Sequence, residues 1–171
     1  DSNTIIEGIT LEQSRMTLYQ SDMILRNCIF MDCRFALGRA VHTGAVPAGT
    51  DGYSQVPIVG GALQIVDGSP RIYNCKFENN AVFAAAGENG YAGAQSHPTG
   101  GDGGWPGGAY GGAVYCGMSG SPEFIDCTFT ENEVFGAEGG NGANGWVDRG
   151  TVYDGGRGGG WVYDDVIEDY L

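Results

Sequence analysis

Three segments of this chain align with one another without gaps, and this internal repeat constrains the fold more than any other feature. The segments are MILRNCIFMDC from Met23, PRIYNCKFENN from Pro70 and PEFIDCTFTEN from Pro122. Their common frame is an apolar residue, any residue, Asn or Asp, Cys, any residue and Phe. A frame that recurs about every 50 residues is typical of proteins whose repeats stack on one another to close a continuous core.

An opening motif precedes the second and third of these segments. GGALQIVDGSP from Gly60 matches GGAVYCGMSGSP from Gly111, and GGWVYDD from Gly159 begins a partial fourth copy. The first copy is degenerate, because SRMTLYQSD from Ser14 stands where the Gly-Gly opening would be. The repeat therefore predicts about three full copies and part of another.

Within each copy the apolar residues recur at every second position, which is the period of a β-strand and not of a helix. The positions predicted to face inward are Met16 and Leu18, Leu63 and Ile65, Val114 and Cys116, then Leu25, Ile72 and Phe124, then Cys28 with Phe30, Cys75 with Phe77, and Cys127 with Phe129. The alternation breaks at Asn27, Asn74 and Asp126, and Asn and Asp tolerate the left-handed backbone conformation of a sharp corner. Each copy is thus predicted to form short strands separated by corners.

Such copies bury their apolar faces only when equivalent residues of successive copies lie above one another. We therefore expect an all-β chain, a right-handed parallel β-helix (solenoid) of about three coils plus a partial fourth. Its structural ladder would consist of the columns Cys28, Cys75 and Cys127; Phe30, Phe77 and Phe129; and Asn27, Asn74 and Asp126. An antiparallel sandwich is the competing fold, but it would not require the same residue type at the same place in each copy.

The predicted organisation is a single domain over residues 1–171. Its coils cover 1–37 (a first coil or an N-terminal cap), 58–83, 111–135 and 159–171 (a partial coil or a docking tail), and its insertions cover 38–57, 84–110 and 136–158. The insertions hold many of the 32 glycines, and loops of this length are normally functional or disordered. Because they follow the same point of each copy, we expect them to leave the coil at one corner and to project together.

Aromatic residues in the insertions and at the end of the chain argue against plain flexible linkers. Rings in such segments can stack on sugars or dock a protein partner, and an unfinished coil exposes strand edges that invite another chain. The possible contact residues are Trp105, Trp146, Trp161 and Tyr163.

The short motifs of the repeat resemble those of a known family. GGAL from Gly60, GGAV from Gly111, FENN from Phe77 and FTEN from Phe129 are similar to the GGA[ILV] and FxxN motifs of right-handed parallel β-helix proteins such as the polymorphic outer-membrane proteins, and to those of glycine-rich secreted bacterial β-helix proteins. The resemblance covers most of the chain and implies an extracellular or cell-surface adhesin, passenger domain or assembly scaffold. The first copy departs from the pattern, because Cys33 stands where FxxN has Asn.

The charge balance restricts the partners. The formal net charge is −13, with 21 acidic residues against eight Lys and Arg, so nucleic acid is a poor partner for this surface. No stretch approaches the run of about 20 apolar residues that spans a bilayer, so we predict no membrane span. The expected partners are further copies of the chain or other subunits of a surface assembly, with glycans as a further possibility.

The five cysteines do not have the spacing of a zinc site. In parallel strands the side chains of one column lie about 4.8 Å apart and point the same way, whereas a disulfide needs converging Cβ atoms about 3.8 Å apart. We therefore predict buried thiols, while oxidation of Cys33 with a neighbour stays open. GGNGANGWV from Gly139 resembles a calcium-binding nonapeptide and makes calcium the one cofactor to consider, with Asp102, Asn141, Asn144 and Asp148 as weak candidate ligands.

No catalytic centre is predicted. The outward residues beside the Cys-Phe strands form no acidic cluster of the kind that polysaccharide-cleaving β-helices use, and His42 and His97 lie in insertions without a recognisable nucleophile and base. The sequence thus favours a non-enzymatic, extracellular structural or adhesive β-solenoid, a subunit or segment of a larger surface assembly or filament. The alternatives are a fragment of a polysaccharide-active β-helix enzyme and a calcium- or glycan-binding module.

Overall fold

The computed structural model describes residues 4–117, 119–148 and 151–159, and these belong to two compact units. The first, here the strand unit, comprises Asp1–Arg39, Gln55–Ala85 and Gly107–Ala137. The second, here the glycine-rich unit, comprises Ala40–Ser54, Ala86–Pro106 and Glu138–Leu171. Each unit is built from three separate stretches of the chain, so each depends on contacts between residues far apart in the sequence.

Every regular element in the described residues is a β-strand. The strands of the strand unit are β1 (Ile5–Glu7), β2 (Thr10–Glu12), β3 (Met16–Tyr19), β4 (Ile24–Arg26), β5 (Ile29–Met31), β6 (Arg34–Ala36), β7 (Ile58–Val59), β8 (Leu63–Val66), β9 (Arg71–Tyr73), β10 (Lys76–Glu78), β11 (Ala81–Phe83), β12 (Ala109–Tyr110), β13 (Val114–Cys116), β14 (Glu123–Ile125), β15 (Thr128–Thr130) and β16 (Glu133–Phe135). All their pairings are parallel, as the repeat predicts.

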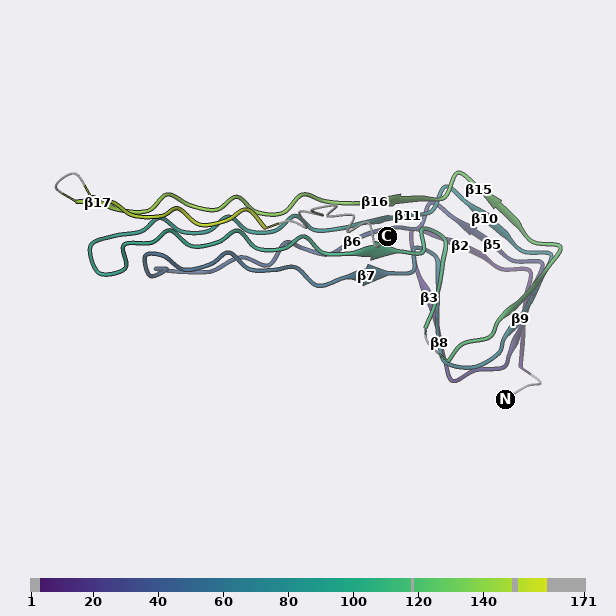
Figure 1. The fold of residues 1–171 in the computed structure, drawn as a ribbon. Helices are drawn as coiled ribbons and strands as arrows, with labels where there is room; N and C mark the ends of the chain where they lie inside the picture. Colours follow the sequence, from purple (N-terminus) through teal and green to yellow (C-terminus); the bar gives the residue numbers. More distant parts are fainter. Residues whose placement is uncertain (1–3, 118, 149–150, 160–171) are drawn as a thin grey trace, which may run out of the picture. The chain divides into compact units, whose positions relative to one another are not determined.

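The sheets follow the repeat. Their strand orders are β1-β4-β9-β14, β2-β5-β10-β15, β6-β11-β16, β3-β8-β13 and β7-β12. The unit therefore consists of a first layer (β1 and β2), a second (β3 to β6), a third (β7 to β11) and an end layer (β12 to β16), whose outlines follow one another in Figure 1. The register matches the sequence alignment, since Phe77 pairs with Phe30 on one side and with Phe129 on the other.

The corners between strands have the backbone conformation that their residue types predict. Asn27, Asn74 and Asp126 have φ of 54°, 46° and 53°. A second corner of the same kind, which the sequence pattern did not indicate, lies after the Phe strand at Asp32, Asn79 and Glu131, with φ of 52°, 52° and 53°. Asn and Asp are the residues that adopt this conformation most readily after glycine, so these corners are locally encoded except at Glu131.

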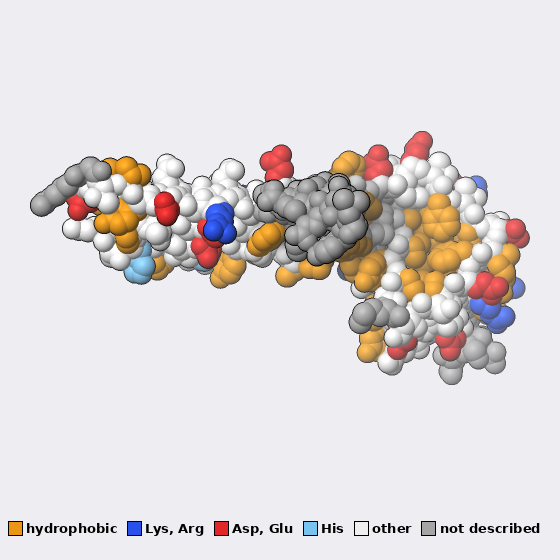
Figure 2. Space-filling view, viewed as in Figure 1, with side chains coloured by type: hydrophobic (Ala, Val, Ile, Leu, Met, Phe, Trp, Pro, Cys, Tyr) orange, Lys and Arg blue, Asp and Glu red, His pale blue; other side chains and the backbone are white. Residues whose placement is uncertain are grey.

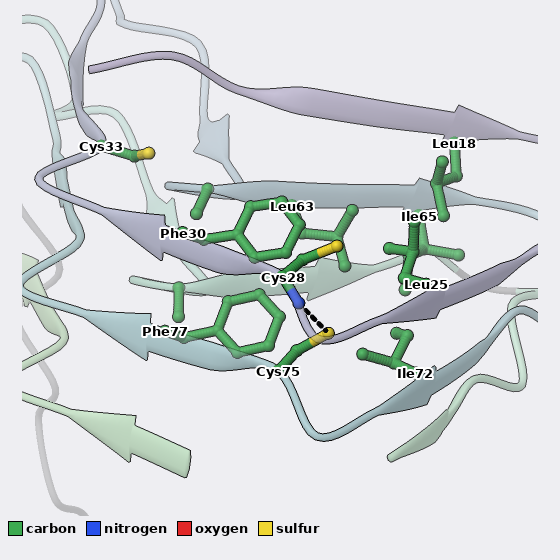
Figure 3. Close-up of a cluster of buried hydrophobic side chains, with 12 residues drawn as sticks. Leu18, Leu25, Cys28, Phe30, Cys33, Leu63, Ile65, Ile72, Cys75 and Phe77 are labelled. Atoms are coloured by element: carbon green, nitrogen blue, oxygen red, sulfur yellow. Dashed lines mark hydrogen bonds between the residues drawn. The ribbon is translucent and has the colours of Figure 1, made fainter. Parts of the chain in front are cut away.

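The core of the strand unit lies between the sheets. The rings of Phe30 and Phe77 point inward beside the thiols of the Cys column, and the aliphatic side chains of the other sheets close around them (Figure 3). The fully buried hydrophobic side chains of the second and third layers include Leu25, Phe30, Leu63, Ile65, Ile72, Phe77 and Val82. Two residues that were predicted to face inward, Cys116 and Phe129, are exposed, because they lie in the end layer, which no further layer covers among the described residues.

Residues 1–37 contain strands of two layers. β1 pairs with β4 and β2 with β5, so Ile6 lies in the column of Leu25 and Leu11 in the column of Phe30. The sequence pattern predicted one coil or a cap over this range. The sequence pattern did not predict this first layer because Ile9 and Leu11 replace the Cys and Phe of the repeat. In addition, far fewer residues separate it from the second layer than separate the later layers from one another.

The glycine-rich unit is ordered by backbone hydrogen bonds between its three stretches. The N–H groups of Gly87, Gly90 and Gly93 donate to the carbonyl oxygens of Glu138, Asn141 and Asn144. This three-residue interval is the repeat of the polyproline II conformation, in which the chain itself forms no internal hydrogen bonds. Disorder, one of the two expectations for the insertions, is therefore wrong for their described residues, which lie side by side as regular extended chains (Figure 1).

Glycine is required in this unit because its chains approach too closely for side chains. A Cβ atom added to Gly104 would collide with the carbonyl oxygen of Tyr53, and one added to Gly87 would collide with that of Gly104. The only regular strands in the described part of the unit are β17 (Val147–Asp148) and β18 (Thr151–Val152), which pair antiparallel. The glycine content therefore reflects tight packing of backbones.

Candidate functional site

The Phe column runs through the centre of the strand unit as a continuous stack. The rings of Phe30 and Phe77 lie 4.8 Å apart with an interplanar angle of 4°, and Phe77 and Phe129 repeat the same distance and angle. The spacing equals the separation of neighbouring strands, because each ring comes from the equivalent residue of the next layer. The second, third and end layers thus add one ring each to the same aromatic stack.

The Cys column contains free thiols that hydrogen-bond the corners. The Sγ atoms of Cys28, Cys75 and Cys127 donate to carbonyl oxygens two residues earlier, at 3.3, 3.3 and 3.4 Å. Cys33 donates in the same way to Met31. Burial raises the pKa of the Cys75 thiol to about 11, so the thiolate, which is the nucleophile and metal ligand, is scarce at neutral pH. These thiols therefore have a structural role, in the core and at the corners of the layers.

A column of amides follows the outer face of the first corner. The Nδ2 of Asn74 donates to Oδ1 of Asn27 at 2.7 Å, and the Nδ2 of Asn27 donates to Glu7 at 3.0 Å. In both bonds the amide donates to the layer before it. Asp126 ends this column in the end layer, and an ionised carboxylate can only accept.

A second, buried Asn column locks the layers together, and the sequence pattern showed it only as the last residue of FxxN. The Nδ2 of Asn80 donates to the carbonyl oxygen of Phe30 at 3.0 Å, and its Oδ1 accepts the N–H of Cys33 at 3.0 Å. Asn132 repeats this one layer on, with its Nδ2 donating to the carbonyl of Phe77 and its Oδ1 accepting from Asn80. Each Asn therefore joins its own layer to the one before.

Substituting Asn80→Ala should lower the free energy of unfolding of the strand unit by about 2–4 kcal/mol, because it leaves the buried N–H of Cys33 and the carbonyl of Phe30 without partners. Asn132→Ala should cost less, because that side chain is only half-buried. Urea denaturation followed by far-ultraviolet circular dichroism measures both. Equal losses for the two variants would contradict the proposed role of burial.

The end layer exposes residues that the preceding layer buries. The side chains of Phe129 and Val134 are 50% and 48% exposed, whereas Phe77 and Val82, which pair with them, are both 0% exposed. Figure 2 shows hydrophobic side chains gathered on the strand unit with acidic side chains around its margin. The strands of the end layer pair on one side only in the described residues, so this face combines apolar side chains with open backbone groups.

The margin of the end layer holds more acidic residues than the same positions of the earlier layers do. Its outward positions hold the exposed residues Glu123, Asp126, Glu131 and Glu133. The corresponding residues of the third layer are Arg71, Asn74, Asn79 and Ala81, and those of the second are Ile24, Asn27, Asp32 and Arg34. Negative charge is thus concentrated in the layer whose face is open.

A buried carboxylate clasps two stretches of the glycine-rich unit. Glu88 is 6% exposed and accepts four hydrogen bonds, from the backbone N–H groups of His42 and Tyr53, from the His42 ring at 2.7 Å and from the Tyr91 hydroxyl at 2.6 Å. The ring of His42 stacks on Tyr53 and meets Tyr91 edge-on. Sequence reasoning missed this cluster, because Glu88 lies far from His42 along the chain and resembles any other loop carboxylate.

A histidine oriented by a carboxylate is also found in catalytic dyads, where the second ring nitrogen acts on a nucleophile. Here the ring of His42 contacts those of Tyr53 and Tyr91, and the carboxylate accepts two backbone N–H groups, both from residues 40–54. The described contacts make Glu88 a tether between residues 40–54 and 86–106. The cluster fixes how these chains lie against each other.

Acidification should weaken this tether. Burial raises the pKa of Glu88, but the bonds from Tyr91, Tyr53 and His42 outweigh it and lower the pKa from 4.5 to about 2. The folded unit therefore holds the proton less tightly than the unfolded chain, so the stabilisation is complete above about pH 4.5 and is lost as the pH falls towards about 2. Hydrogen exchange of the glycine-rich amides should accelerate over that range relative to its intrinsic rate, and Glu88→Gln should remove this dependence.

The four candidate calcium ligands and the four candidate contact residues do not form one site in the described residues. Asp102 accepts the backbone N–H of Arg157 at 2.6 Å, and the backbone N–H of Asn141 donates to Asn89 at 2.9 Å. Asn144 accepts from Gly93 through its carbonyl oxygen, and Asp148 lies in β17. Trp105 and Trp146 are partly exposed, whereas Trp161 and Tyr163 lie outside the described residues.

A scan against protein-family models found no match to the chain, and searches of the curated proteins and of the solved structures found no significant match either. The described residues contain no helix that could cross a lipid bilayer. The geometry itself defines the class of protein. It is an all-β protein with layers of parallel, in-register strands and with hydrogen-bonded glycine-rich chains.

Proposed function

We propose that this chain is a non-enzymatic, extracellular structural or adhesive β-solenoid, a subunit or segment of a larger surface assembly or filament. In this proposal the layers of the strand unit are successive coils of a right-handed parallel β-helix. The in-register Phe, Cys and Asn columns support it, because they make every layer a template for the next. The resemblance of the GGA[ILV] and FxxN motifs to those of surface β-helix proteins supports the extracellular setting.

The observation that carries the proposal is the open end layer. Phe129 and Val134 continue columns that are fully buried one layer earlier, yet they are half exposed. Unpaired strand edges with apolar side chains are ready templates for another chain. A further layer would bury these side chains and pair the open backbone groups, and this is how a stacked protein extends.

The association of the purified chain tests this function. Light scattering over a concentration series should show a mass that rises above that of the monomer when the salt concentration is increased from about 0.1 M to about 1 M, because salt screens the acidic margin while the apolar contact persists. Phe129→Ser should abolish the rise, whereas Tyr19→Ser, at an exposed position of β3, should leave it unchanged. A monomer under every condition would overturn the assembly function.

A further inference from the structure

We propose that the end layer of the strand unit is a docking surface for a basic partner protein, which adds a parallel strand layer to it. This inference rests on the proposed assembly function and names the chemistry of the partner. The surface consists of an apolar centre that includes Phe129 and Val134 and of the acidic margin at Glu123, Asp126, Glu131 and Glu133.

The columns of the strand unit show what such a partner must present. Equivalent residues of neighbouring parallel strands lie about 4.8 Å apart, so each margin carboxylate would face one partner side chain directly. The chain contains this arrangement already: Glu7 pairs in register with Arg26 and forms an ion pair with it at 2.7 Å, and Glu123 pairs in register with Arg71 of the third layer. Opposite charges stabilise such cross-strand pairs and like charges oppose them. Lys or Arg opposite the margin, and apolar residues opposite the centre, therefore complement the end layer.

A second copy of this chain complements the margin poorly. Its first layer would place Ile5 over Glu123, Gly8 over Asp126 and Gln13 over Glu131, so three of the four carboxylates would face no cation. Only Glu133 would meet one, Arg15, which the same register places above it. That layer also carries Glu7 and Glu12, which add negative charge. At moderate salt the first layer is thus a weaker occupant than a basic segment.

The chain's own residues 159–171 are an unsuitable occupant by charge. The segment GGWVYDDVIEDYL contains four acidic residues and no Lys or Arg. It also has Asp164 where the repeat has Ile65 and Cys116. The charges therefore favour a different and basic chain over both the second copy and this segment.

The outer amide column independently calls for a hydrogen-bond donor on the partner opposite Asp126. In earlier layers an Asn donates from each layer to the one before, as Asn74 does to Asn27. Asp126 accepts but cannot donate, so it receives a bond only if the adjoining residue is a donor. Lys and Arg supply several donors each, and their bonds to a carboxylate are of the stronger, charge-assisted kind.

A peptide with the strand pattern of the end layer itself tests the inference. It has the sequence of residues 122–135 with Cys127→Val and with Glu123→Lys, Asp126→Lys, Glu131→Lys and Glu133→Lys. One control peptide keeps the four acids, and a second has the lysine peptide's composition in scrambled order. Binding to the full chain is measured by isothermal titration calorimetry at about 0.05 M and at about 0.5 M salt.

The lysine peptide should bind at least about tenfold more tightly than either control at low salt, and salt should weaken it. The full-chain variant Glu123→Gln, Asp126→Asn, Glu131→Gln, Glu133→Gln should lose this preference. Equal binding of all three peptides, no binding of the lysine peptide, or an unchanged preference in the variant would overturn the basic partner. If the inference fails while salt-induced association persists, the assembly function stands without it; if both fail, the assembly function falls too.

Discussion

Phe77→Ala should lower the free energy of unfolding of the strand unit by about 3–5 kcal/mol. Phe77 is fully buried and is the central ring of its column, stacked between Phe30 and Phe129 at 4.8 Å on both sides. Its removal deletes two stacked ring contacts and an edge-on contact with Phe124, and leaves a cavity between strands that are held in register on either side. Urea denaturation followed by circular dichroism, with the midpoint and slope fitted together, measures the loss.

Phe129→Ala is the matched control, because it removes the same ring from the next layer of the same column. Phe129 is half exposed and stacks on one neighbour, so we expect less than half the loss of Phe77→Ala. If the two variants were equally destabilised, a further layer would already cover Phe129 in solution, and the open end layer would not be the docking surface proposed above.

The register of the strand unit could be predicted from the sequence because its code is local and repeated. The Asn or Asp corner, the Cys and the Phe occupy fixed places in each copy, and parallel stacking without gaps is the simplest arrangement that buries them all. The first layer escaped prediction because Ile9 and Leu11 preserve the apolar character of the columns without the residue types that mark the repeat.

A pattern based on side chains could not predict that the glycine-rich unit is ordered. Its stability comes from backbone hydrogen bonds such as Gly87 to Glu138 and Gly90 to Asn141, and any residue can form these. Glycine content alone is equally typical of flexible linkers. Only a three-residue interval of glycines combined with close backbone contact distinguishes packed glycine-rich chains from flexible linkers. The contacting stretches lie about 50 residues apart, the length of one repeat.

The candidate site, too, could be predicted from the sequence only in part. The columns that lead to the end layer follow from the repeat, but the exposure of Phe129 and Cys116 depends on the end of the stack and not on residue type. Glu88 gave no signal in the sequence, because three of its four hydrogen bonds come from His42 and Tyr53, which are distant along the chain, and two of these are from backbone N–H groups. Sites made of backbone groups cannot be found by residue pattern.

Gly104→Ala should disrupt the glycine-rich unit, with a local loss of about 3 kcal/mol or more. The added methyl group would collide with the carbonyl carbon and oxygen of Tyr53 and with the carbonyl oxygen of Gly52, and backbone atoms cannot rotate away as a side chain can. The chains must therefore separate. Separation also weakens two backbone hydrogen bonds: the one that the Gly104 N–H donates to the carbonyl oxygen of Glu88, and the one that the Gly104 carbonyl oxygen accepts from the Gly140 N–H.

Hydrogen exchange of the full chain distinguishes this effect from a loss of the strand unit. In Gly104→Ala the amides of Gly87, Gly104 and Gly140 should exchange at least about a hundredfold faster, the rate change that about 3 kcal/mol of local opening produces. Gly158→Ala is the matched control, because the nearest atom to its added Cβ is the Gly140 carbonyl oxygen at 3.9 Å, and it should leave those amides unchanged. Because the obstruction in Gly104→Ala is backbone against backbone, unchanged protection there would mean that the extended chains do not lie in contact, and the tight packing inferred for this unit would be wrong.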